Sequence, residues 1–214
     1  MSTEFDYIIV GAGTAGCLLA NRLSADASKR VLLIEAGRRD DYHWIHIPVG
    51  YLYCIGNPRT DWLYQTEAQP GLNGRALRYP RGKTLGGCSS INGMIYMRGQ
   101  ARDYDQWADL TDDPSWRWDA SLPYFKLHED HHAGATALHG ARGTPPELMQ
   151  DASTPYRKLL RGRNAGGEWR IERPRVRWDI LDAFAQAAQQ AGVPATTDFN
   201  RGDNEGVSYF EVNQ

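Results

Sequence analysis

The feature that most constrains the fold is a glycine loop that directly follows a short apolar run near the N-terminus. The run covers residues 5–10 (FDYIIV) and reads as a buried parallel strand. Gly11, Gly13 and Gly16 follow it with G-x-G-x-x-G spacing. In that pattern the first glycine permits a tight turn, the second lets the backbone approach a pyrophosphate, and the third lets a helix lie close to the strand. Residues 17–23 carry the apolar positions of such a helix, so the sequence predicts a dinucleotide-binding β–α–β unit.

An acidic residue at the end of a second apolar run supports this prediction. Residues 31–34 (VLLI) read as the second strand, and Glu35 follows them, 19 residues after Gly16. A carboxylate at this place accepts hydrogen bonds from the hydroxyls of an adenosine ribose, and it repels the 2′-phosphate of NADP. The alternative is a simple glycine turn with a solvent-facing Glu35. The motif alone does not separate NAD from FAD, because both cofactors present the same ADP half.

A second glycine-rich stretch lies at residues 81–99 (RGKTLGGCSSINGMIYMRG). Its glycines alternate with Ser89, Ser90 and Asn92, so backbone N–H groups can approach a flat or anionic ligand while hydroxyl and amide groups orient it. The alternative is an ordinary glycine-rich loop.

Taken together, these stretches resemble the glucose–methanol–choline (GMC) flavoprotein oxidoreductases, in particular their choline-dehydrogenase-like and aliphatic alcohol dehydrogenase branch. The resemblance also covers residues 47–64 (IPVGYLYCIGNPRTDWLY), 103–140 and 166–214. It implies an α/β fold with a Rossmann-like FAD-binding core, long irregular lid segments and the start of an α+β substrate domain.

The resemblance further implies that FAD is the cofactor and that two sets of residues bind it. The pyrophosphate and ribose set comprises Gly11, Gly13, Thr14, Ala15, Gly16, Glu35 and Ala36. The set along the flavin comprises Arg81, Gly82, Leu85, Gly86, Gly87, Asn92, Gly93 and Met94. Some family members carry a histidine in this signature that bonds covalently to the flavin. The matching position here is Ile91, so we expect a non-covalent, dissociable FAD.

The aromatic residues between 42 and 64 are expected to cover the cofactor as a lid, although aromatic groups that only pack a long loop would look the same. Residues 1–141 are thus assigned to the FAD-binding region with its lid and second signature. Residues 142–165, which are proline-punctuated and basic, interrupt the resemblance and are expected to be an inserted mobile loop. A role for this loop at a partner or membrane surface stays open. Residues 166–214 are assigned to the rest of the FAD region and the start of an incomplete substrate domain.

A histidine-rich stretch at residues 128–132 (HEDHH) raises the question of a metal site. Its spacing does not match H-E-x-x-H, and Ala133 and Gly134 would end any helix there. We therefore expect a surface turn and assign no metal ligand. Further along, the pattern predicts a strand at 168–172, a helix that Asp179 caps and that ends near Gly192, and a last strand at 207–212.

No catalytic residue is assigned. GMC proteins are usually more than twice as long as this chain, and their catalytic histidine lies in the part that this sequence does not match. The six histidines here stand in no matching motif. The resemblance implies the FAD-binding N-terminal portion of a dehydrogenase that oxidises CH–OH donors and passes hydride to FAD, inactive as this chain alone. The remainder is then deleted or supplied by a complementing C-terminal chain. The alternatives are a non-catalytic FAD-binding fragment or subunit, and an NAD-dependent dehydrogenase.

Composition limits the partners. With 41% apolar and 23% charged residues the chain is typical of soluble globular proteins, and its net charge of −2 disfavours nucleic-acid binding. The three cysteines show no C-x-x-C spacing, no signal peptide opens the chain, and every apolar run is shorter than the ~20 residues of a transmembrane helix. We expect a cytoplasmic protein that acts on a small alcohol, with peripheral attachment at the inner membrane left open.

Overall fold

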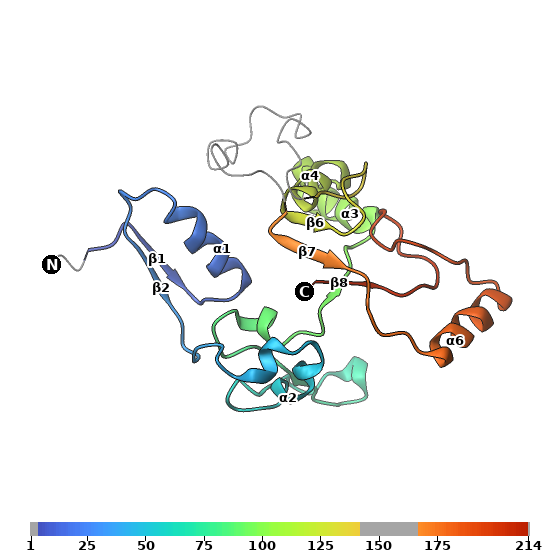
Figure 1. Ribbon diagram of the computed structural model, residues 1–214, viewed down its shortest axis with the longest axis horizontal. Helices are drawn as coiled ribbons and strands as arrows, with labels where there is room; N and C mark the ends of the chain where they lie inside the picture. Colours follow the sequence, from blue (N-terminus) through green and yellow to red (C-terminus); the bar gives the residue numbers. More distant parts are fainter. Residues whose placement is uncertain (1–3, 142–166, 214) are drawn as a thin grey trace. The chain divides into compact units, whose positions relative to one another are not determined.

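The computed structural model describes residues 4–141 and 167–213. They divide into two compact units, one ending at Met94 and the other beginning at Ile95 (Figure 1). Both units combine helices with small sheets, which confirms the predicted α/β class. The predicted insertion at 142–165 lies outside the described residues.

The first unit begins with the predicted β–α–β arrangement. Strand β1 (Tyr7–Val10) pairs in parallel with β2 (Val31–Ile34), and α1 (Thr14–Leu23) connects them (Figure 1). A Cβ atom added to Gly16 would collide with the carbonyl oxygen of Gly11, so only glycine lets α1 start this close to the end of β1. The third glycine of the motif therefore has the packing role that its spacing predicts.

The rest of this unit is built from short elements. It contains η1 (His43–His46), η2 (Pro48–Gly50), α2 (Tyr51–Cys54), η3 (Pro70–Leu72) and η4 (Gly87–Ser90). Strands β3 (Tyr64–Gln65) and β4 (Arg78–Tyr79) form an antiparallel pair. Among the aromatic residues, Trp44 and Tyr53 stack with their ring centroids 4.1 Å apart.

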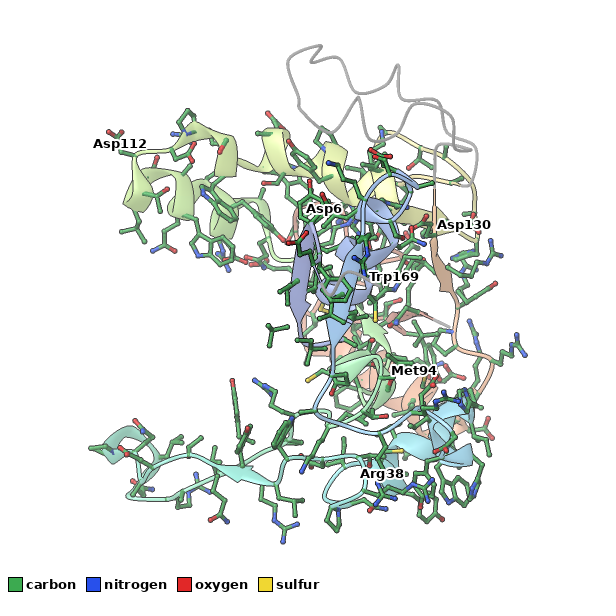
Figure 2. The ribbon with its side chains drawn as sticks, turned by 90° about the vertical axis from the view of Figure 1, so that its left-hand side faces the viewer. Asp6, Arg38, Met94, Asp112, Asp130 and Trp169 are labelled. Carbon is green, nitrogen blue, oxygen red and sulfur yellow. The ribbon has the colours of Figure 1, made fainter. Side chains whose placement is uncertain are left out.

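The second unit is organised around a four-stranded sheet of order β5-β8-β7-β6. The strands are β5 (Ile95–Tyr96), β6 (Glu129–His131), β7 (Trp169–Glu172) and β8 (Glu211–Asn213), of which β6 and β7 are parallel. The helical elements are α3 (Ala101–Thr111), η5 (Pro114–Trp116), α4 (Trp118–His128) and α6 (Asp179–Gln190). Asp112 ends α3 in the left-handed conformation, and Figure 2 shows it at the tip of that helix.

Two sequence-based boundaries need correction here. Asp179 is the first residue of α6 rather than its cap, so its carboxylate lies in the first turn, where the helix dipole favours negative charge. The last strand covers residues 211–213 instead of 207–212, because Val207 donates its amide hydrogen to the carbonyl of Pro194 in a separate connection. The strand predicted at 168–172 is confirmed as β7.

Charged side chains are buried beside this sheet. The Arg98 guanidinium donates to the Glu129 carboxylate at 2.8 Å, and the two side chains are 1% and 0% exposed. The His139 ring lies between two carboxylates, 3.1 Å from an oxygen of Glu129 and 3.1 Å from an oxygen of Asp198. Burial lowers the pKa of His139, but its hydrogen bonds to Asp198 and Glu129 outweigh burial and raise the pKa to about 9. The imidazole is therefore charged at neutral pH.

This cluster overturns the surface turn predicted for residues 128–132. Glu129 and His131 belong to β6 and are 0% and 6% exposed. The sequence did not indicate that Glu129 and His131 are buried. Their hydrogen-bonding partners Arg98, His139 and Glu211 lie elsewhere in the sequence. None of the helices in residues 4–141 and 167–213 combines the length and the apolar character needed to cross a membrane.

Candidate dinucleotide-binding site

The loop between β1 and α1 has open space at its first two glycines. Gly11 adopts φ +94°, and a Cβ atom built there would meet no atom within 4 Å. At Gly13 such an atom would meet only the Cα of Gly87, at 4.0 Å. The backbone thus leaves space at Gly11 and Gly13, where the motif predicts contact with a pyrophosphate, whereas Gly16 is closely packed.

The first turn of α1 offers backbone donors to a ligand. Gly13 is the N-cap residue, and no side chain provides a capping hydrogen bond. The amides of Thr14, Ala15 and Gly16 occupy the positive end of the helix dipole, and no acidic side chain lies in this turn. A ten-residue helix that begins in this way is suited to bind a phosphate group.

The half-buried Glu35 is held beside the glycine loop. One carboxylate oxygen accepts the amide hydrogen of Ala12 at 2.7 Å, and the other accepts that of Gly37 at 2.8 Å. The carboxylate therefore does not simply face solvent. Because each oxygen of a carboxylate can accept about two hydrogen bonds, both oxygens keep capacity for the hydroxyls of a ribose.

The second glycine-rich stretch joins the first loop directly. The amide of Gly86 donates to the carbonyl of Ala12 at 2.7 Å, and the amide of Leu85 donates to the carbonyl of Arg38 at 2.8 Å. Gly13 pairs with Gly86, and Arg38 with Thr84, as isolated parallel bridges. Residues 84–86 therefore run between the glycine loop and the chain that leaves β2. The structure thus places part of the second predicted set, residues 85–87, directly against the first glycine loop and the chain after β2.

The turn at Gly86 and Gly87 requires glycine. Gly86 and Gly87 adopt φ +89° and +57°, and a Cβ on Gly87 would approach the Cα of Gly13 to 2.8 Å. A larger residue at position 87 would thus separate the two loops. Gly82 is constrained as well, since its Cβ would collide with the carbonyl group of Gly87.

The remaining predicted residues lie along the same stretch. The Asn92 side chain accepts the amide hydrogen of Met94 at 2.7 Å and holds Met94 at φ +63°. Gly93 faces the ring of Tyr51, which a Cβ would meet at 3.9 Å. Ile91 is buried, and the exposed Ala36 follows Glu35. The Arg81 guanidinium lies 3.8 Å from the ring centroid of Tyr79.

Sequence reasoning missed Asp61, which fixes the start of the second stretch. Its 3% exposed side chain accepts amide hydrogens from Gly56 at 2.8 Å, Leu63 at 2.9 Å and Arg81 at 3.1 Å. Burial raises the pKa of Asp61, but these backbone donors outweigh burial and hold the pKa below its usual value. The contacts of Asp61 with Gly56 and Leu63 are local, but no local motif indicates the contact with Arg81, which is 20 positions away.

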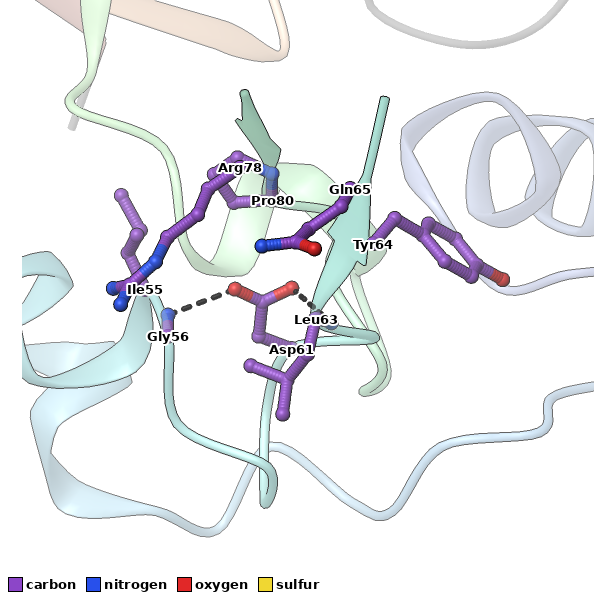
Figure 3. A pocket seen from close by; sticks show the side chains of 8 residues that line it. All are labelled: Ile55, Gly56, Asp61, Leu63, Tyr64, Gln65, Arg78 and Pro80. Carbon is purple, nitrogen blue, oxygen red and sulfur yellow. Dashed lines mark hydrogen bonds between the residues drawn. The ribbon is translucent and has the colours of Figure 1, made fainter. Parts of the chain in front are cut away.

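Asp61 also borders a cavity of about 430 Å³ beside strands β3 and β4 (Figure 3). Figure 3 shows its carboxylate between the amides of Gly56 and Leu63. The cavity is lined by Ile55, Gly56, Asp61, Leu63, Tyr64, Gln65, Arg78 and Pro80. None of these residues belongs to the two predicted cofactor sets, although Asp61 contacts the start of the second glycine stretch through the amide of Arg81.

Comparison with known proteins decides the family. The family model described as GMC oxidoreductase matches residues 5–214. The chain belongs to this family. Membership confirms the resemblance predicted from the two glycine stretches, and it implies a flavin cofactor.

The similar curated GMC proteins include two dehydrogenases. The chain is 37% identical to human mitochondrial choline dehydrogenase, over 98% of this chain and 32% of that protein. It is 39% identical to the alcohol dehydrogenase [acceptor] of Pseudomonas putida, over 98% of this chain and 34% of that protein. The chain thus spans about a third of the length of the curated relatives it matches.

Solved structures agree with the family. The match to pyridoxine 4-oxidase from Mesorbium loti covers 99% of this GMC chain and 37% of the oxidase chain, with 36% identity and a TM-score of 0.81. The match to a formate oxidase covers 97% of this chain and 34% of the oxidase chain, with 26% identity and a TM-score of 0.72.

Proposed function

We propose that the first unit binds FAD non-covalently and that the chain is the FAD-binding part of a dehydrogenase that oxidises the CH–OH group of a small alcohol. The carrying observation is the hydrogen bond between Gly86 and Ala12, which joins the two glycine stretches beside Glu35. The first stretch suits the ADP group that NAD and FAD share, and the resemblance to GMC proteins assigns the second stretch to the flavin.

The residues fit the cofactor in three places. The open surface at Gly11 and Gly13 and the amides of the first turn of α1 would bind the pyrophosphate. Glu35 would accept the ribose hydroxyls. The backbone of residues 81–94, whose turns are fixed by glycine and by the Asn92–Met94 contact, would lie along the flavin.

Non-covalent binding is supported by position 91. Ile91 occupies the place in the flavin signature where a histidine would form the bond, and its side chain contains no nucleophilic atom. It is 3% exposed, packed as an ordinary core residue.

When bound, the flavin would accept a hydride from the alcohol carbon. The chain's own residues bind and orient the cofactor, and residues 81–94 include no histidine or carboxylate that could take the hydroxyl proton. We therefore propose that the base belongs to the part of the enzyme that the matched third does not cover. The names of the relatives favour choline or another alcohol as substrate.

A complementing chain is supported by exposed apolar side chains on the two-stranded sheet. Ile8 and Val10 of β1 are 60% and 84% exposed, and two strands alone are only marginally stable in water. Because Ile8 and Val10 lie on the same face of the sheet, a layer of structure supplied by another part of the enzyme would cover them. A cytoplasmic location, and attachment at the inner membrane, stay predictions.

The test is a titration of the purified chain with FAD, FMN and NAD⁺. Flavin fluorescence and calorimetry measure the binding. We expect one FAD per chain and affinity for FAD at least tenfold above that for FMN, because FMN lacks the adenosine that Glu35 would bind. Tighter binding of NAD⁺ than of FAD would contradict the proposal, and so would equal affinity for FAD and FMN.

A further inference from the structure

Three side chains with metal-binding atoms converge in the second unit. His131 is the last residue of β6, His132 follows it, and Glu211 is the first residue of β8. The Nε2 atom of each imidazole lies 2.9 Å from Oε1 of Glu211, and the three atoms lie within 4.8 Å of one another. Strand β7 separates β6 from β8 in the sheet, so the cluster connects two strands that do not pair with each other.

The carboxylate in this cluster has a distinctive environment. The Glu211 side chain is 13% exposed, and its other oxygen lies 3.4 Å from the Asn200 amide nitrogen. Within residues 4–141 and 167–213 no lysine or arginine forms an ion pair with Glu211. The buried cations Arg98 and His139 pair with Glu129 and Asp198 instead. A bound cation would therefore give the Glu211 carboxylate a positive charge that no lysine or arginine of the described residues supplies.

We propose that His131 Nε2, His132 Nε2 and Glu211 Oε1 form a binding site for a divalent transition-metal ion of the Zn²⁺ class. Two imidazole nitrogens and one carboxylate oxygen are a common ligand set for zinc, and three protein ligands leave a fourth position for water. Imidazole ligands favour such an ion over Mg²⁺ or Ca²⁺, which prefer oxygen. The ion would cross-link β6 to β8. This site is independent of the proposed flavin function.

The metal competes with hydrogen bonds of the metal-free chain. The amide of Ala133 donates to Nδ1 of His131 at 3.3 Å, so the ring proton resides on Nε2, which donates to Glu211. Binding of the ion to Nε2 moves this proton to Nδ1 and gives up the long Ala133 contact. The site should therefore bind its ion reversibly.

The experiment uses the untagged chain after treatment with EDTA and dialysis. Calorimetry with Zn²⁺ should show one ion per chain, and Zn²⁺ should raise the unfolding temperature. Glu211→Gln keeps an oxygen that accepts a hydrogen bond but removes the anionic ligand, and His132→Gln removes one nitrogen. Each should weaken Zn²⁺ binding at least tenfold, whereas His43→Gln, a change at an exposed histidine of the first unit, should leave it unchanged.

Circular dichroism checks that the variants fold, and the parent chain provides a readout that needs no variant. Co²⁺ bound to the parent should show the intense visible absorption of a four-coordinate ion. The proposal is overturned if Zn²⁺ does not bind, if Mg²⁺ binds equally well, if folded variants bind Zn²⁺ like the parent, or if bound Co²⁺ shows only the weak spectrum of six-coordinate Co²⁺.

Discussion

At the scale of single residues, Glu35 combines a structural and a proposed binding role. Its carboxylate orders the glycine loop through Ala12 and the chain after β2 through Gly37. A substitution at Glu35 therefore changes both the loop and the ribose contact. The two effects can be separated only by varying the ligand as well as the protein.

We predict that Glu35→Ala weakens FAD binding at least tenfold, because a hydrogen bond to a charged acceptor contributes about 1.5–3 kcal/mol. The parent should also bind an FAD analogue without the adenosine 2′-hydroxyl more weakly than FAD, while the variant should hardly distinguish the two. Fluorescence titration measures all four affinities, with Glu67→Gln as the exposed control. If the variant discriminates against the analogue as strongly as the parent does, Glu35 does not contact the ribose.

We predict that Asp61 contributes to the stability of the chain. Its carboxylate accepts three backbone amide hydrogens and is 3% exposed, so Asp61→Asn should lower the free energy of unfolding by about 1–3 kcal/mol at pH 7. Asp41→Asn is the matched control, because the Asp41 side chain is 66% exposed and its ion pair with Arg59 should contribute at most about 1 kcal/mol.

The pH dependence of this effect follows from the lowered pKa of Asp61. A carboxyl group whose folded-state pKa lies below its unfolded value of about 3.9 contributes stability above that pH, and the contribution is lost as the pH falls towards the folded-state pKa. The difference between parent and Asp61→Asn should be constant from pH 7 to about pH 5 and shrink below about pH 4. Urea unfolding at several pH values measures it; a difference that grows in acid would show that Asp61 is stabilised in its protonated form.

At the scale of elements, local signals predicted the N-terminal β–α–β unit well. The strand at 31–34 has the observed bounds, and the glycine spacing identifies both the turn at Gly11 and the close packing at Gly16. These features depend on a few neighbouring residues. The bond between Gly86 and Ala12 depends on residues 74 positions apart, and only the resemblance to a family connected the two stretches.

Burial of charged residues was the feature that sequence reasoning predicted worst. The stretch at 128–132 looks like a solvated turn until Arg98, His139 and Glu211 are known to face it. Likewise, the expected strand at 207–212 was too long because alternation alone did not reveal that Val207 bonds to Pro194. In both places long-range partners decide the structure.

The second glycine stretch also carries a prediction about the cofactor. Because Ile91 offers no nucleophile, acid or heat should release all FAD from the loaded chain. After precipitation with acid, the yellow colour should remain in the supernatant. Flavin that stays in the washed, unfolded pellet would demonstrate a covalent bond to another residue.

At the scale of the whole molecule, flavin binding and turnover should separate. A positioned base contributes typically ~10²–10⁴-fold to a proton transfer, and residues 81–94 contain no group to act as one. We predict that a polypeptide of these 214 residues, saturated with FAD, does not oxidise choline, aliphatic alcohols or benzyl alcohol. Reduction of an artificial electron acceptor measures the rate. Steady turnover well above that of free FAD would reveal a base among the residues considered structural.

The two compact units also allow the central claim to be localised. If FAD binds at the joined glycine stretches, the backbone amides that it protects against hydrogen exchange should lie within the first unit. The proposed metal site lies in the second unit, so Zn²⁺ should protect a different set of amides.

The most direct measurement is therefore amide hydrogen exchange of the chain with and without saturating FAD, read by mass spectrometry. We predict slower exchange in peptides that cover residues 11–17, 35–38 and 82–94, and no change around His131 and Glu211. Protection confined to the second unit, or to the cavity beside Asp61, would contradict the assignment of the two glycine stretches as the FAD site.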